Sequence, residues 1–128
     1  VSRAVGILER EPIDIYVNPT FVPDQIAKDY DKLWTDERIM KVVKAARKGD
    51  VAIEMNNRYR LPGMRFLQAA KAEGLKFSFG TNNTDAKLGR CEYGLEAVKQ
   101  CDLNWTDFFV PPPVGERGID RKGSILKA

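Results

Sequence analysis

The chain has 128 residues, of which 43% are hydrophobic and 30% are charged, a composition typical of one globular domain. Its 21 basic and 18 acidic residues are interspersed and give a net charge of +3, so there is no basic stripe for nucleic-acid binding. No run approaches the roughly 20 apolar residues of a membrane span, and no signal peptide is visible. The chain begins with Val1, which leaves open a processed start or a piece of a longer reading frame.

The two cysteines, Cys91 and Cys101, lie ten residues apart in the sequence. This spacing fits neither a metal site nor a redox pair, so we expect two reduced, partly buried thiols. Reduced thiols and the lack of a signal peptide together predict a cytoplasmic protein.

The amino-terminal part of the chain predicts a helix, a strand and a long loop. Residues 1–11 have apolar positions that suit the end of a helix, and Pro12 stops it. Residues 13–17 read IDIYV, a β-rich run that is closed by the turn Asn18-Pro19. Residues 20–33 predict a long loop with a short helix.

The helix predicted over residues 36–48 has the clearest signals. Thr35 is placed to cap its first turn, where Asp36 and Glu37 supply the carboxylates that the helix dipole favours. Gly49 follows as the expected stop. The expected buried face consists of Ile39, Met40, Val43 and Ala46.

A strand, a helix and another strand are predicted next. The strand covers residues 51–55, and Pro62 is expected at the first position of the helix. Gly74 should end that helix in a left-handed conformation, and residues 75–79 should form the third strand.

A polar loop over residues 80–90 then leads to a helix over residues 91–100, which we expect to bury Leu95 and Val98. Because strands alternate with helices of about 12 residues, the pattern predicts right-handed βαβ units and a parallel sheet. The sequence therefore predicts an α/β domain over residues 1–110 and an irregular Pro- and Gly-rich tail over residues 111–128.

Polar residues follow each predicted strand. In parallel α/β folds, ligands bind at the carboxyl ends of the strands, so these residues are the candidates for a site. The first strand end offers Asn18. The second offers Glu54, Asn56, Asn57, Arg58 and Arg60, and the third offers Thr81, Asn82, Asn83, Thr84 and Asp85.

In this order, the segments IDIYVNP, VAIEMNN and KFSFGTNNTDAKLG resemble the carboxyl-terminal portion of the PHP (polymerase and histidinol phosphatase) family of metallophosphoesterases. The resemblance covers residues 11–110. Its most specific parts are the Glu-x-Asn at Glu54 and Asn56 and the turn that begins at Gly80. It implies a partial parallel β/α barrel of about three strands, similar to the carboxyl-terminal half of a distorted TIM barrel.

The resemblance also implies that the family's metal ligands are replaced here. The family's His before Pro falls on Asn18, and the Asp and His of its last motif fall on Asn82 and Thr84. Only Glu54 and Asn56 match, a pair that shapes the family's site more than it binds metal. Neutral amides are weak metal ligands, so we expect no cofactor in this chain, whereas intact relatives use a divalent metal such as zinc or manganese.

Binding of a small phosphorylated or polar ligand is the chemistry that remains. Arg58 and Arg60 can hold a phosphate or carboxylate through bidentate contacts, unless they are solvated loop residues. The amides can bind a polyol, or they can make turns and caps instead. Glu54 can act as a base, or it can be a buried carboxylate paired with an arginine. The candidate amides are Asn18, Asn56, Asn57, Asn82 and Asn83.

Three hypotheses follow. The first is a fragment or degenerate member of a PHP-like hydrolase family, not competent alone, whose amino-terminal half would supply the metal ligands. The second is a non-catalytic ligand-binding or assembly domain. The third is a metal-independent enzyme with Glu54 as its catalytic base and Arg58 as its anion clamp. A partial barrel exposes apolar edges, so we expect either a homo-oligomer or a missing half that covers them.

Overall fold

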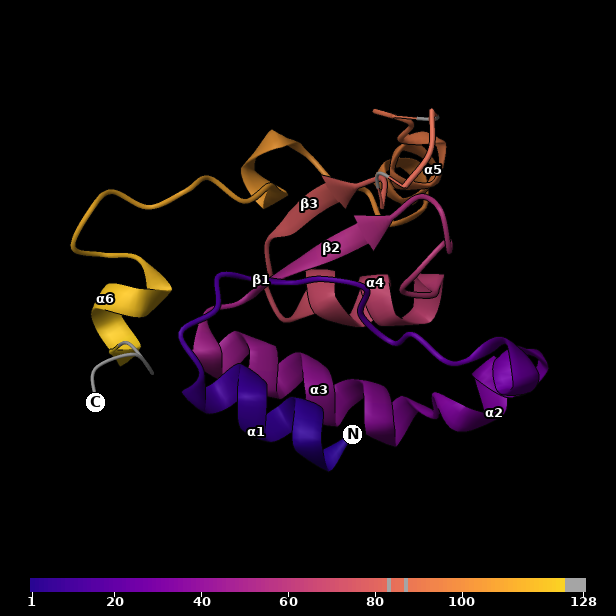
Figure 1. Ribbon diagram of the computed structural model, residues 1–128, viewed down its shortest axis with the longest axis horizontal. Helices are drawn as coiled ribbons and strands as arrows, with labels where there is room; N and C mark the ends of the chain where they lie inside the picture. The colour runs from indigo at the N-terminus through magenta and orange to yellow at the C-terminus, as the bar shows by residue number, and fades with distance from the viewer. Residues whose placement is uncertain (83, 87, 124–128) are drawn as a thin grey trace.

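The computed structural model describes residues 1–82, 84–86 and 88–123. Its centre is a sheet of three parallel strands, ordered β1 (Ile15–Tyr16), β2 (Ala52–Asn56) and β3 (Phe77–Gly80), as Figure 1 shows. The chain alternates between these strands and helices, which confirms the predicted parallel α/β fold. Strand β1 is shorter than its predicted five residues, because only Ile15 and Tyr16 pair with β2.

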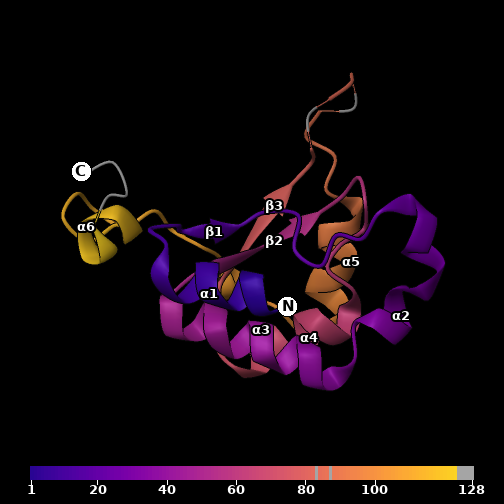
Figure 2. The same cartoon turned by 60° about the horizontal axis from the view of Figure 1, so that its bottom comes forward.

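The helices lie mainly on one side of the sheet. In Figures 1 and 2, α1, α3 and α4 form a group beneath the strands, while α6 lies apart near the C-terminus. The helices are α1 (Ser2–Arg10), α2 (Tyr30–Leu33), α3 (Asp36–Gly49), α4 (Met64–Ala72), α5 (Glu92–Gln100) and α6 (Gly118–Lys122), with 3-10 turns η1 (Asp24–Asp29) and η2 (Trp105–Asp107). None of the helices in the described ranges is long and apolar enough to cross a membrane.

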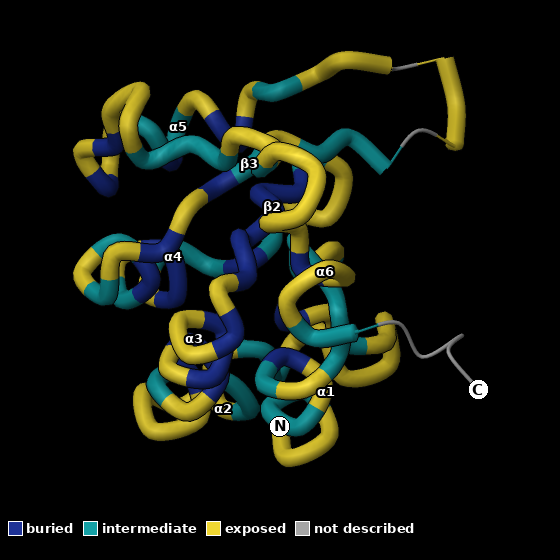
Figure 3. Tube along the Cα trace, turned by 90° about the vertical axis from the view of Figure 1, so that its left-hand side faces the viewer, coloured by how far each residue is buried: buried dark blue, intermediate teal, exposed yellow. Residues whose placement is uncertain are grey.

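The core fills the space between the sheet and these helices. Strand β2 is buried over its whole length, and buried residues concentrate at the centre of the molecule in Figure 3. The side chains that meet there include Ile53, Met55, Phe66, Leu67, Phe77, Val42 and Val43. After α5 the chain returns alongside β3, where Phe108 pairs in parallel with Phe77 and the amide of Phe109 donates to the carbonyl of Phe77 at 2.8 Å.

Helix α3 matches its prediction at the start and differs at the end. The Thr35 side chain accepts a hydrogen bond from the amide of Arg38 at 3.4 Å, which confirms the cap. Gly49 does not stop the helix, because Asp50 takes the left-handed conformation with φ of 54°. Gly49 is needed for packing instead: a Cβ there would lie 1.9 Å from the carbonyl oxygen of Leu8 in α1. On the buried face, Met40 is only half-buried, and Val42 and Ala45 take its place.

Two predictions about α4 have different outcomes. Gly74 adopts a left-handed φ of 74°, as expected. Pro62 is not the first helical residue, because α4 begins at Met64 with Gly63 as its cap. The carbonyl of Pro62 instead accepts a hydrogen bond from the hydroxyl of Tyr93 in α5.

Helix α5 buries a different face from the predicted one. Leu95 is 56% exposed and Val98 is only partly buried, whereas Tyr93, Gly94 and Ala97 face the interior. Two contacts explain why α5 turns this face, and not the predicted one, towards the interior. Tyr93 reaches Pro62, and Gly94 leaves room for the ring of Phe79, whose Cδ1 would lie 2.3 Å from a Cβ at this position.

The carboxyl-terminal segment is not wholly irregular, because it contains α6. The amide of Gly118 donates to the Asp14 carboxylate at 2.8 Å. The Lys122 ammonium donates to the carbonyls of Leu8 (3.2 Å) and Glu11 (3.1 Å) at the end of α1. Burial lowers the pKa of Lys122. This short helix therefore ties the end of the described chain to its beginning.

Candidate binding site at the strand ends

Three predicted site residues meet at the carboxyl ends of β1 and β2. The backbone amide of Asn18 donates to Oε2 of Glu54 at 2.7 Å. The side-chain amide of Asn56 donates to Oδ1 of Asn18 at 2.7 Å and to Oε2 of Glu54 at 3.4 Å. Glu54 is 8% exposed and Asn56 is fully buried. The structure brings these three candidate residues together, and we call them the polar cluster.

The polar cluster is committed to holding the backbone. The Oδ1 atom of Asn56 accepts a hydrogen bond from the amide of Tyr59 at 3.0 Å, which fixes the loop after β2. Asn18 has a left-handed φ of 48°, and its amide is held by Glu54. Glu54 is thus paired with a backbone amide and with Asn56, so the arginine partner considered for it was wrong. A Cβ on residue 80 would lie 1.8 Å from Oε1 of Glu54, so only glycine at that position leaves room for the Glu54 carboxylate beside β3.

A separate hollow of about 360 Å³ opens at the ends of β2 and β3. We call it the strand-end hollow. Its lining residues are Asn57, Arg58, Thr81, Asp85 and Arg90. The side chain of Arg58 is 43% exposed, and its guanidinium donates to the hydroxyl of Thr84 and lies 3.8 Å from the carboxylate of Asp85. Arg90, 58% exposed, lies 3.7 Å from Glu92. Among the described residues, two exposed arginines and one carboxylate therefore line the hollow.

Asn57 connects this hollow to α5. Its backbone amide donates to the carbonyl of Gly80 at 2.8 Å, and its side-chain oxygen accepts from the amide of Tyr93 at 2.8 Å. Asn57 therefore satisfies a free amide in the first turn of α5, which is the capping role considered for the asparagines.

Arg60 does not line the strand-end hollow. Its guanidinium lies 2.5 Å from the carboxylate of Glu96 and 4.8 Å from the ring centre of Tyr93, so it is held against α5. Asn82 is half-buried with a left-handed φ of 52°, and it is not among the hollow's lining residues. Asn83 lies outside the described residues.

Arg90 is the lining residue that the sequence analysis missed. Arg90 lies shortly before α5, at the end of the loop that follows β3. This loop starts at the carboxyl end of β3, and that position was the signal in the sequence that could have identified Arg90. A basic residue before a helix usually counts as part of a solvated loop, which is why the pattern did not single it out.

The residues at the strand ends do not fit a metal cluster of the kind that the PHP resemblance implies. Among the described residues there is no group of three or more His, Cys, Asp or Glu side chains that could hold a metal ion. The side-chain oxygens of Asn18 and Asn56 already accept hydrogen bonds. The carboxylate of Glu54 accepts two hydrogen bonds, from the Asn18 backbone amide and the Asn56 side chain, and both reach its Oε2 atom. Such a set cannot balance the charge of clustered divalent ions. Cys91 and Cys101 are free thiols, and burial raises the pKa of Cys101.

The fold and the strand-end hollow define a parallel α/β protein with polar residues at the carboxyl ends of its strands. Comparison of the chain with family models, with curated proteins and with solved structures finds no match.

Proposed function

We propose that this chain is a PHP-like β/α domain that binds a small anionic ligand, such as a phosphate ester or a carboxylate, and that does not hydrolyse it alone. One observation carries the proposal: Arg58 and Arg90 line the same hollow at the carboxyl ends of two parallel strands. This edge of a parallel sheet is where α/β proteins bind their ligands.

The chemistry of the hollow suits an anion with several oxygens. A guanidinium offers paired N–H donors that match a phosphate or carboxylate, and its hydrogen bonds to charged oxygens are stronger than neutral ones. The present partners of Arg58 include a hydroxyl and a carboxylate 3.8 Å away, both on the exposed loop after β3, and the ring of Tyr59, whose centre is 5.8 Å away. An anion would replace these partners without uncovering a buried charge.

The arrangement of the motifs supports descent from a PHP-like barrel. The Asn18-Pro19 turn follows β1, the Glu-x-Asn lies within β2, and the Gly80 turn ends β3, so all three lie at one edge of the sheet. We propose that residues 1–110 form part of such a barrel. In this proposal Glu54 is a positioning residue, because its carboxylate holds the Asn18 amide.

Calorimetric titration with inorganic phosphate tests the proposal. We expect saturable binding to the wild-type chain, and a loss of about tenfold or more in affinity for Arg58→Met and for Arg90→Met. Arg10→Met is the matched control: it removes the same charge from α1, where Arg10 donates to the carbonyl of Gly6 in its own helix. Equal weakening in all three variants, or no binding at about 10 mM phosphate, would show that the two arginines form no specific site.

A further inference from the structure

A second hollow, of about 410 Å³, lies between the loop after β1 and the loop after β2. We call it the aromatic hollow. Its apolar wall includes Phe21, Val22, Tyr59 and Leu61, and two carboxylates, Asp24 and Asp31, stand at its border. It shares no lining residue with the strand-end hollow.

Two residues of this apolar wall form an exposed aromatic pair. The rings of Phe21 and Tyr59 meet edge to face, with centroids 5.2 Å apart and planes at 65°. The two residues are nevertheless 48% and 41% exposed. The Arg58 guanidinium lies over the Tyr59 ring, 5.8 Å from its centre. The exposed area that remains on the two rings can receive another ring or a cation.

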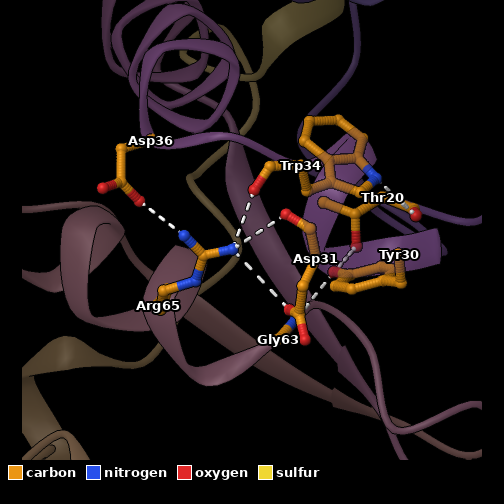
Figure 4. A network of polar contacts seen from close by, with 7 residues as sticks. All are labelled: Thr20, Tyr30, Asp31, Trp34, Asp36, Gly63 and Arg65. Carbon is orange, nitrogen blue, oxygen red and sulfur yellow. Dashed lines mark hydrogen bonds and ion pairs between the residues drawn. The ribbon is translucent and has the colours of Figure 1, made fainter.

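Figure 4 shows the hydrogen bonds that hold three other lining residues of the aromatic hollow, Tyr30, Asp31 and Gly63. The hydroxyl of Tyr30 lies 2.6 Å from the Thr20 hydroxyl and accepts from the amide of Gly63 at 3.0 Å. Arg65 in α4 donates to the carbonyls of Asp31 (3.3 Å) and Trp34 (3.0 Å). The loop after β1 is therefore fastened to the start of α4. A preformed wall lowers the ordering cost of binding a ligand.

The charges at the hollow favour a cation. Arg60 also borders it, but its guanidinium is paired with Glu96 at 2.5 Å and lies over the ring of Tyr93. Asp31 lies 3.6 Å from Arg65, and its side chain is 88% exposed. Asp24 makes no ion pair within the described ranges of the chain. The border of the hollow therefore keeps an unneutralised carboxylate.

The geometry points to a second binding site here, for a small molecule that carries a ring and a protonated amine. The ring packs on Phe21 and Tyr59, and the ammonium group faces Asp24. This class of ligand is opposite in charge to the anion proposed for the strand-end hollow, so probes of opposite charge distinguish the two sites. Arg58 is adjacent to both, because it lines the strand-end hollow and lies 5.8 Å from the ring centre of Tyr59.

Benzylamine is a suitable probe, with benzyl alcohol and benzoate as neutral and anionic molecules of similar shape. We expect amide NMR signals of residues around the hollow, Gly63 and Tyr59 among them, to shift saturably with benzylamine. Judged from these signals, its affinity should be severalfold higher than that of benzyl alcohol, and benzoate should bind this hollow most weakly. Benzoate bound in the strand-end hollow would shift the signals of that hollow instead. Asp24→Asn and Tyr59→Leu should each weaken benzylamine binding by about twofold to fivefold.

Glu73→Gln is the matched control, because it removes one negative charge at the end of α4 outside the hollow and should leave the affinity unchanged. Both exposed substitutions should preserve the dispersed NMR spectrum of the folded chain. Three results would each overturn the assignment: benzoate shifting the Gly63 signal with the same affinity as benzylamine, benzylamine shifts confined to other regions, or an Asp24→Asn variant with unchanged affinity.

Discussion

At the scale of single residues, the polar groups nearest the strand ends stabilise the backbone and leave ligand contacts to their neighbours. Asn56 is fully buried and uses its side chain both as donor, to Asn18 and Glu54, and as acceptor, from Tyr59. None of the buried side-chain polar atoms in the described residues lacks a hydrogen-bond partner. The neighbouring Arg58, in contrast, is exposed and has partners that an anion can replace.

Asn56→Ala should therefore lower the free energy of unfolding strongly. The substitution leaves the Tyr59 amide and the Asn18 oxygen without their partner, and an unsatisfied buried polar group costs about 1–3 kcal/mol. Urea denaturation measures the change. The control Gln68→Ala removes an exposed amide in α4 and should change stability by less than about 0.5 kcal/mol. Equal effects would contradict the structural role of Asn56.

Asp107 gives the structure a defined response to acid. Burial alone would raise the pKa of its carboxyl, but hydrogen bonds from the Asn104 amide (2.8 Å) and from Lys71 (2.5 Å) outweigh burial, and the pKa is lowered. Because folding lowers this pKa, the ionised carboxylate stabilises the folded state at pH values above the unfolded pKa of about 3.9. This stabilisation is lost as the pH falls through the folded pKa.

Asp107→Asn should therefore cost on the order of 1 kcal/mol at pH 6 and less at pH 3, which lies below the unfolded pKa of about 3.9. Urea unfolding of both proteins at the two pH values checks this. If the difference in stability between wild type and variant is the same at both, the ionised carboxylate is not the stabilising form.

At the scale of elements, the sequence predicts a helix or strand well where the signal is local. Helix α3 has its cap at Thr35 and acidic residues in its first turn, so its start was correct. The buried face of α5 depends on Phe79 and Pro62, which belong to other elements, so Leu95 was wrongly placed inside.

The same distinction applies to the candidate site. The strand-end positions of Glu54 and Asn56 followed from the strand pattern. Two other features depend on how the loops fold back, which no short sequence pattern contains. The Asn56 side chain holds Tyr59 and Asn18, and Arg90 lines the same hollow as Arg58.

Two glycine substitutions test how closely α1 and α3 pack. Gly49→Ala should destabilise the protein by about 1–3 kcal/mol, because the new Cβ would collide with the Leu8 carbonyl and force the helices apart. Gly6→Ala in α1 meets only the flexible end of the Arg10 side chain and should be neutral or stabilise by up to about 1 kcal/mol. Thermal unfolding of the two variants separates them, and destabilisation by both to the same extent would contradict the close helix contact.

At the scale of the whole molecule, the sheet is open. Within the described residues β1 pairs only with β2, and Val17 beyond it is 56% exposed. At the other end of the sheet, Trp105 and Val110 flank the pairing at Phe108 and are 86% and 78% exposed. Unpaired strand edges and exposed apolar side chains favour association.

We therefore predict that the chain forms dimers or larger assemblies in sedimentation experiments. Val17→Lys should shift the distribution towards monomer, because a charge beside an edge strand opposes pairing with another chain. Lys28→Arg is a control that keeps the surface charge and should leave the distribution unchanged. A wild-type chain that stays monomeric at high concentration would contradict association through these edges.

The most direct test of the central claim, anion binding without a metal cluster, is phosphate titration of chelator-treated protein with and without added zinc or manganese. Arg58 and Arg90 supply the positive charge in the strand-end hollow, and the amides of the polar cluster are poor metal ligands. We predict the same phosphate affinity in both conditions and much less than one metal ion bound per chain. Phosphate binding that appears only with about one or more bound metal ions per chain would contradict the account.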